Sequence, residues 1–125
     1  MKRFVFSLLI LFASLAAVAQ SSPCGAPTPG SPHVCLTWTA STTSGVTYNV
    51  YRSTTTGGEN FATPLNSAPI SNLFYYDTTV ALGTTYFYKL VAVGTGGVLS
   101  TPTAEVSAQI PVPPNPPSTP AAAID

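Results

Sequence analysis

Charged residues are scarce in this chain of 125 residues. Four Lys and Arg stand against four Asp and Glu, so that 6% of the residues are charged, where a typical soluble domain has roughly 25%. Nucleic-acid binding needs a basic face that replaces phosphate counterions, and four cations cannot form one. The composition therefore excludes nucleic acid as a partner. Because 45% of the residues are hydrophobic, it also excludes disorder driven by charge.

Residues that could act in catalysis or bind a metal are equally few. The chain has one His, His33, and its carboxylates are scattered at positions 59, 77, 105 and 125. No two of them are placed as a pair for glycoside hydrolysis, and no Ser lies in a nucleophile elbow. A lone His does not supply a set of metal ligands. We therefore expect no enzyme activity, no cofactor and no metal.

No apolar run reaches the roughly 20 residues of a membrane-spanning helix. Lys2 and Arg3 precede an apolar run from Phe4 to Val18, and the run ends in small residues up to Ala19. This pattern is typical of a secretory signal peptide over residues 1–19, cleaved after Ala19. We expect a secreted, periplasmic or cell-surface protein with no stable membrane span in the mature chain. A retained N-terminal anchor is the alternative.

Proline is concentrated at both ends of the expected mature chain. Residues 20–32 hold four Pro, which favours an irregular edge strand or loop. Residues 111–120 hold six Pro, which favours an extended polyproline II spacer. We therefore divide the chain into the signal peptide, the Pro-rich segment 20–32, a folded domain over 33–111 and a Pro-rich tail or linker over 112–125.

The folded domain shows alternation of apolar and polar residues at period two, with no helical pattern. Turn-rich separators divide it into short segments at roughly 10-residue spacing, which is typical of an antiparallel sandwich. The expected strands are His33–Thr39, Thr47–Ser53, Phe61–Leu65, Leu73–Asp77, Thr84–Val93 and Thr103–Ile110.

Four motifs in this domain resemble those of fibronectin type III domains from secreted bacterial proteins. They are Leu36-Thr37-Trp38, Tyr48-Asn49-Val50-Tyr51-Arg52-Ser53, Tyr75-Tyr76-Asp77 and Gly83-Thr84-Thr85-Tyr86-Phe87-Tyr88. The resemblance covers residues 33–111 and implies an all-β, immunoglobulin-like antiparallel β-sandwich of about seven strands. Segment Thr84–Val93 has no Cys, so the intersheet disulfide of true immunoglobulin domains cannot form.

Alternation along the strands predicts which residues fill the core. In the last strand, Ala104, Val106, Ala108 and Ile110 are expected to point inward. The resemblance places Tyr86 at the family's tyrosine corner, where the hydroxyl bonds to upstream backbone. The expected core residues are Trp38, Tyr48, Val50, Tyr75, Tyr86 and Tyr88.

The two cysteines, Cys24 and Cys35, are the only Cys in the chain. In an exported protein they predict a disulfide that fastens the Pro-rich segment to the first strand. A reactive thiol pair or a metal site is the alternative, which the absence of a CxxC motif and the single His disfavour.

The alternation also predicts an outward aromatic patch formed by Tyr51, Phe87 and Val91. Exposed aromatic residues on a sheet can stack on a sugar or anchor a protein, so this patch is the candidate binding surface. The alternative is that these residues supply strand propensity only.

The acidic residues have structural roles in this interpretation. We expect a solvated Glu59, an Asp77 bonded to local backbone and a surface pair between Glu105 and Lys89.

Together these features favour a non-catalytic secreted or cell-envelope module that mediates protein or carbohydrate contact with an unknown ligand. The alternative is a structural spacer domain of a larger secreted or surface protein or extracellular hydrolase. The Pro-rich segment 111–120 favours that alternative, because such segments separate domains.

Overall fold

The computed structural model of the chain describes residues 24–25 and 31–124. The expected signal peptide and most of the expected edge strand over 20–32 lie outside the described residues. Among those that are described, no helix is long and apolar enough to cross a membrane.

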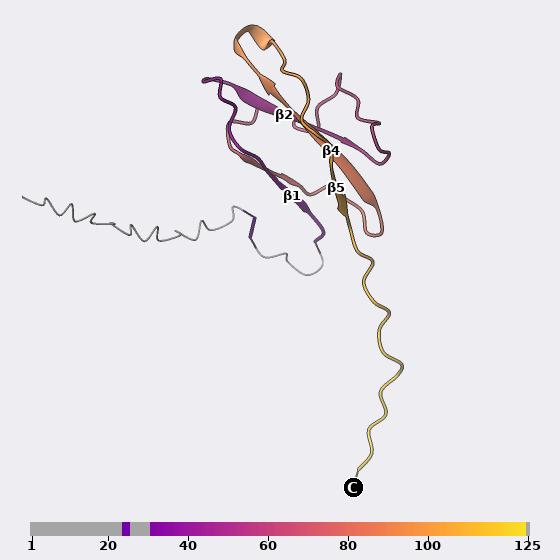
Figure 1. Cartoon of the computed structure of the whole chain (residues 1–125). Coiled ribbons are helices and arrows are strands. Elements are labelled where there is room, and N and C mark those ends of the chain that lie inside the picture. The colour runs from indigo at the N-terminus through magenta and orange to yellow at the C-terminus, as the bar shows by residue number, and fades with distance from the viewer. Residues whose placement is uncertain (1–23, 26–30, 125) are drawn as a thin grey trace, which may run out of the picture.

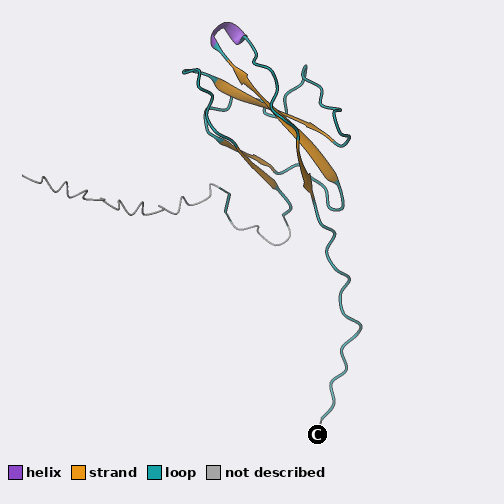
Figure 2. Ribbon diagram, viewed as in Figure 1, coloured by secondary structure: helices purple, strands orange, loops and turns teal. Residues whose placement is uncertain are grey.

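Two antiparallel sheets form the body of the protein, so the predicted all-β sandwich is confirmed. One sheet pairs β1 (Val34–Thr37) with β3 (Phe74–Asp77), and the other has the order β2 (Thr47–Ser53), β4 (Thr85–Val93), β5 (Val106–Gln109). The two sheets lie as separate layers in Figure 1. A short 3-10 turn, η1 (Thr95–Gly97), lies at the end of the body opposite the extended tail (Figure 2).

The described residues form five strands rather than about seven. The prediction of a strand over Phe61–Leu65 was wrong, because this segment consists of turns and bends. Two hydrogen bonds nevertheless run from this region to β2: Leu65 N–H donates to the Val50 carbonyl at 2.7 Å, and Ile70 N–H donates to the Tyr48 carbonyl at 3.2 Å.

Asn66 takes the place of a neighbouring strand at the outer edge of β2. Its Oδ1 accepts a hydrogen bond from Val50 N–H at 2.8 Å, and its Nδ2 donates to the Ala68 carbonyl at 2.9 Å and to Asn49 Oδ1 at 3.1 Å. Because the Asn66 side chain is buried, these bonds replace water that would otherwise satisfy the β2 backbone. Asn66 thus satisfies Val50 N–H, between the backbone bonds that Leu65 and Ile70 make to the same edge.

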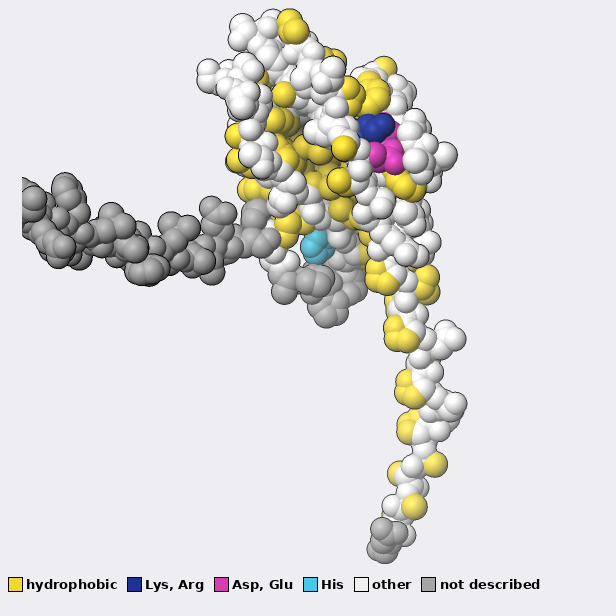
Figure 3. Space-filling model, viewed as in Figure 1, with side chains coloured by type: hydrophobic (Ala, Val, Ile, Leu, Met, Phe, Trp, Pro, Cys, Tyr) yellow, Lys and Arg dark blue, Asp and Glu magenta, His cyan; other side chains and the backbone are white. Residues whose placement is uncertain are grey.

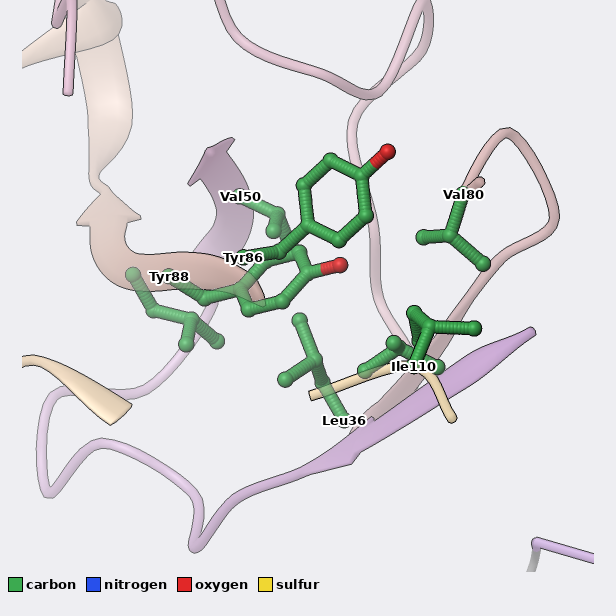
Figure 4. Packing of buried hydrophobic residues seen from close by; sticks show 8 residues of the cluster. Leu36, Val50, Val80, Tyr86, Tyr88 and Ile110 are labelled. Atoms are coloured by element: carbon green, nitrogen blue, oxygen red, sulfur yellow. The ribbon is translucent and has the colours of Figure 1, made fainter. Parts of the chain in front are cut away.

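The core lies between the two sheets, where residues of β4 meet β1 and the C-terminal end of β5. Figure 4 shows Tyr86 and Tyr88 side by side, with Leu36, Val80 and Ile110 facing them. Val50 and Tyr88 have no exposed surface, and Tyr48 and Tyr86 are also buried. These four residues are therefore core residues, as the alternation predicted.

Other residues that were expected inside are more exposed. Trp38 and Tyr75 are half-buried and pack against the core from its margin. Val106 is 49% exposed, so its expected inward burial was wrong, as it was for Ala104, which is also exposed. The reason is that β5 is an edge strand, and the facing sheet has only two described strands to cover it.

Tyr86 carries the backbone hydrogen bond that its motif implied. Its hydroxyl accepts from Ala81 N–H at 3.0 Å, five residues upstream. The bond ties the turn between β3 and β4 to the body of the sandwich, next to the buried side chain of Val80.

Replacing Tyr86 with Phe should lower the free energy of unfolding by about 1 kcal/mol, the net value of one such hydrogen bond. Chemical denaturation measures the change. Tyr75→Phe is the matched control: Tyr75 is half-buried, and no hydrogen bond of its hydroxyl occurs among the described residues, so we expect a change within about 0.5 kcal/mol. Equal effects of the two changes would contradict the role of the Tyr86 hydroxyl.

Replacing Asn66 with Ala should lower the free energy of unfolding by about 2 kcal/mol, because Val50 N–H is left buried without an acceptor. Asn72→Ala is the control, since Asn72 is exposed; its effect should stay within about 0.5 kcal/mol. Faster amide hydrogen exchange at Val50 in the Asn66 variant would locate the loss at the β2 edge, and unchanged exchange there would count against it.

Candidate functional site

The disulfide predicted from sequence is present between Cys24 and Cys35. The residues are 11 positions apart and their Cα atoms are 5.7 Å apart, within the usual range for a disulfide. The bond fastens the segment before β1 to that strand, and in the chain-entropy model a loop of this size is worth on the order of 3 kcal/mol. A disulfide is compatible with a location outside the cytoplasm.

The predicted aromatic binding patch is covered by the chain itself. Tyr51 is 1% exposed and Val91 is buried, whereas Phe87 is half-buried. Phe61, which follows β2 in the loop, packs on Tyr51 with ring centroids 4.9 Å apart. The expectation that Tyr51 and Val91 are exposed was therefore wrong, because alternation places a residue on the outer face but does not show which loop folds over it.

An ion-pair cluster holds this covering loop in place. Lys89 Nζ lies 3.4 Å from Glu59 Oε2 and 4.0 Å from Glu105 Oε2, and Glu105 also accepts a hydrogen bond from Gly57 N–H at 2.7 Å. The expected pair of Lys89 with Glu105 is present. The expectation of a solvated Glu59 was wrong, because the loop brings its carboxylate under cover, with 0% of the side chain exposed.

Asp77 is the other acidic residue within the body, and it is 1% exposed. Its Oδ1 accepts from Thr79 N–H at 3.0 Å, the local backbone bond that was expected, and from Thr79 Oγ1 at 2.8 Å. Its Oδ2 accepts from Tyr88 at 2.8 Å and forms an ion pair with Arg52 Nη1 at 2.7 Å. The last two bonds could not be predicted from the sequence, since they join strands of different sheets.

This network fixes the protonation of its members. Burial alone would raise the pKa of Asp77, but the hydrogen bonds from Thr79, Arg52 and Tyr88 outweigh burial and lower the pKa below its usual value. Burial raises the pKa of Tyr88, and its bond to Asp77 raises it further. With both carboxylate oxygens engaged, Asp77 is a structural anion and is not placed to take a proton from a substrate.

A further strip of aromatic rings lies on the β1–β3 sheet. The rings of Phe74 and Tyr76 are 5.7 Å apart at an interplanar angle of 72°, and those of His33 and Tyr76 are 5.8 Å apart at 63°.

The described surface has an apolar groove and a smaller cleft among its cavities. The larger is an apolar groove of about 600 Å³ at the base of the tail, lined by Leu82, Ile110 and Val112 among others. Its lining also includes Ser31, Pro32 and His33. The smaller is a cleft of about 210 Å³ at the opposite end of the sandwich. We take this smaller cleft as the candidate site because of its side chains.

The aromatic residues Trp38 and Tyr48 form one side of this cleft, which we call the Trp38–Tyr48 cleft. Their rings meet edge to face with centroids 5.4 Å apart. The floor includes Leu90 and Ala92 from the C-terminal half of β4. The rest of the lining is small and hydroxylic, and none of it is charged: Thr39, Ser41, Ser100 and Thr103.

Hydrogen bonds position the hydroxyl groups of the cleft. Tyr48 Oη accepts from Ser41 N–H at 2.8 Å, Ser41 Oγ accepts from Thr43 N–H at 3.2 Å, and Thr103 Oγ1 accepts from Leu90 N–H at 3.0 Å. Each of these oxygens is thus held by a backbone donor, while its own O–H proton has no acceptor among the described residues. These three hydroxyl groups can therefore donate to a ligand, whereas the Ser100 hydroxyl already donates to the Thr101 carbonyl at 2.9 Å.

Trp38 adds an unusual feature beneath the cleft. Its Nε1 atom is buried and has no hydrogen-bond partner within the described residues. An unpaired buried donor costs about 1–3 kcal/mol. The sequence placed Trp38 in the core and gave no signal that it would line a cleft.

In comparisons with known proteins, no family model and no curated protein matches this sequence. On the face shown in Figure 3, charged side chains form one small group. In the described residues, no group of three or more His, Cys, Asp or Glu side chains is placed to hold a metal ion.

The pKa of Asp77 predicts how stability depends on pH. Because the folded-state pKa lies below the usual 3.8, the stabilisation is present above that value and is lost as the pH falls through 3.8 toward the folded-state pKa. Asp77→Asn should lower stability at neutral pH and flatten this acid limb, which urea unfolding at a series of pH values measures. In the Asp77→Asn variant the lowered pKa of Glu59 still makes stability fall with decreasing pH, with a smaller slope than in the unchanged chain. An acid limb of unchanged steepness in the variant would refute this role of Asp77.

Proposed function

We propose that the chain is an exported, non-catalytic fibronectin type III module that binds a protein or carbohydrate through the Trp38–Tyr48 cleft. The observation that carries the proposal is an uncharged cleft with two aromatic rings and hydroxyl donors. Aromatic rings with polar edges are the side chains that most often supply contact energy at binding surfaces.

Three further observations support this proposal. The sequence motifs resemble those of fibronectin type III domains, and the two antiparallel sheets are consistent with that fold. The signal-peptide pattern and the Cys24–Cys35 disulfide agree with export. The acidic residues of the body, Glu59, Asp77 and Glu105, are all bound in ion pairs away from the cleft, which leaves it without a general acid or base.

A structural spacer within a larger secreted or surface protein is the second candidate. The observation that favours it is the tail: residues 111–124 are exposed throughout and extend away from the body (Figure 1). A Pro-rich segment of this kind acts as a semi-rigid connector. A spacer needs no ligand in the cleft, so binding at the cleft separates the two candidates.

A photocrosslinking amino acid in place of Thr39, which lines the cleft and is exposed, tests the proposal in the cells that produce the protein. We expect crosslinked product from position 39 but not from position 42, where the exposed Thr42 lies in the same loop outside the cleft. Polysaccharide products are found by carbohydrate staining and protein products by mass spectrometry. Equal products from both positions, or none from either, would reject the cleft as the contact site and leave the spacer.

A further inference from the structure

The tail, residues 111–124, belongs to neither of the two sheets. Residues 111–124 are all exposed, and Val112 keeps 70% of its surface in solvent. Apolar side chains follow the extended tail in Figure 3. The six prolines of this segment favour polyproline II structure. Such segments bind with low ordering cost in aromatic grooves, because they are already extended before they bind.

The hydrogen-bonding chemistry of the tail complements that of the cleft. Proline has a carbonyl acceptor but no N–H donor, so residues 111–120 offer mainly acceptors. The Trp38–Tyr48 cleft offers the O–H protons of Ser41, Tyr48 and Thr103 and no charge. The three hydroxyl protons can donate to carbonyl groups of the Pro-rich segment when water is removed.

The size of the cleft also suits a short length of extended chain. At about 210 Å³ it is smaller than the roughly 300–1,000 Å³ of pockets that enclose a small molecule. The half-buried ring of Trp38, backed by the buried ring of Tyr48, can pack against prolyl rings, as aromatic residues do in grooves that bind polyproline II segments. Because Trp38 Nε1 is itself buried, the indole contributes its ring surface to this contact.

The tail and the cleft lie at opposite ends of the sandwich. The tail leaves the body after Ile110, which is bonded to Gly83 and Thr84 just before β4 begins. The cleft contains Leu90 and Ala92, near the end of β4. A tail that points away from its own body (Figure 1) must reverse direction to reach its own cleft, whereas a second copy placed end to end meets it directly.

We propose that the Trp38–Tyr48 cleft of one copy binds the Pro-rich segment 111–120 of a second copy, so that copies join head to tail. The inference rests on the proposed function, because it names the partner of the same cleft. A heterologous contact of this kind does not close on itself, and it produces open chains of copies rather than a symmetric dimer.

Sedimentation velocity of the whole chain over a concentration series tests the proposal. We expect self-association that rises with concentration and that either of two variants weakens by about tenfold or more. One variant changes the tail, with Pro113, Pro114, Pro116 and Pro117 each replaced by Ala. The other, Thr39→Glu, places a charge at the cleft, and Thr42→Glu is its control and should associate as the unchanged chain does.

Mixing the two variants gives the sharper result. The tail variant keeps an intact cleft and the Thr39→Glu variant keeps an intact tail, so an equal mixture should form a one-to-one complex that cannot grow further. Thr39 and the four prolines are exposed, so unfolding midpoints of the variants should match that of the unchanged chain. A mixture that stays monomeric, or an unchanged chain that stays monomeric throughout the series, would overturn the proposal.

The single Trp of the chain gives a direct signal from the cleft. A synthetic peptide with the sequence of residues 111–120 should change the fluorescence of Trp38 in the tail variant, and a peptide with its four central prolines replaced by Ala should not. Cellohexaose and chitohexaose are tested in parallel. A response to a sugar but not to the peptide would overturn the head-to-tail contact and leave the proposed binding function standing.

Discussion

The sandwich depends on one buried carboxylate. Asp77 lies in β3, and its ion pair with Arg52 and hydrogen bond from Tyr88 reach β2 and β4 in the opposite sheet. A buried charge is costly unless every oxygen is satisfied, and here four bonds satisfy both. The guanidinium of Arg52 also lies over the ring of Tyr86, 4.8 Å from its centroid, so the network is joined to the turn that the Tyr86 hydroxyl fastens. The positions of the two sheets, and hence of the cleft at their far end, follow from this contact.

Within the described residues 31–124, every charged side chain takes part in an ion pair. Arg52 pairs with Asp77 between the sheets, and Lys89 pairs with Glu59 and Glu105 beneath the loop that covers Tyr51. The surface that remains presents aromatic rings, hydroxyl groups and proline. Recognition by such a surface relies on shape, apolar contact and donor–acceptor matching rather than on charge. This explains why the candidate site is a small aromatic cleft and why an uncharged, acceptor-rich segment suits it.

Local sequence patterns predicted the strands, but they did not show which loops cover the outer face of each strand. Alternation predicted β2 with its observed bounds and most of β4, because β-branched and aromatic residues at period two form a half-buried sheet surface. The same alternation placed Tyr51 on the outer face correctly and its exposure wrongly, since Phe61 and Glu59 reach it from a loop. It also predicted a strand over Phe61–Leu65 where the side chain of Asn66 supplies the edge hydrogen bonds instead. A single side chain that supplies an edge hydrogen bond produces no alternation of apolar and polar residues, so a sequence pattern cannot reveal it.

The sequence by itself determined the all-β class, the Cys24–Cys35 pairing and the scarcity of charged side chains, because these follow from residue types, alternation and a count of two cysteines. The tertiary structure alone decided which aromatic residues are open to a partner. Trp38 and Tyr48 lie 10 residues apart, and the cleft between them exists only because β4 supplies its floor and the segment after η1 supplies its hydroxyl rim. Long-range contacts decide exposure, and exposure decides which side chains can bind.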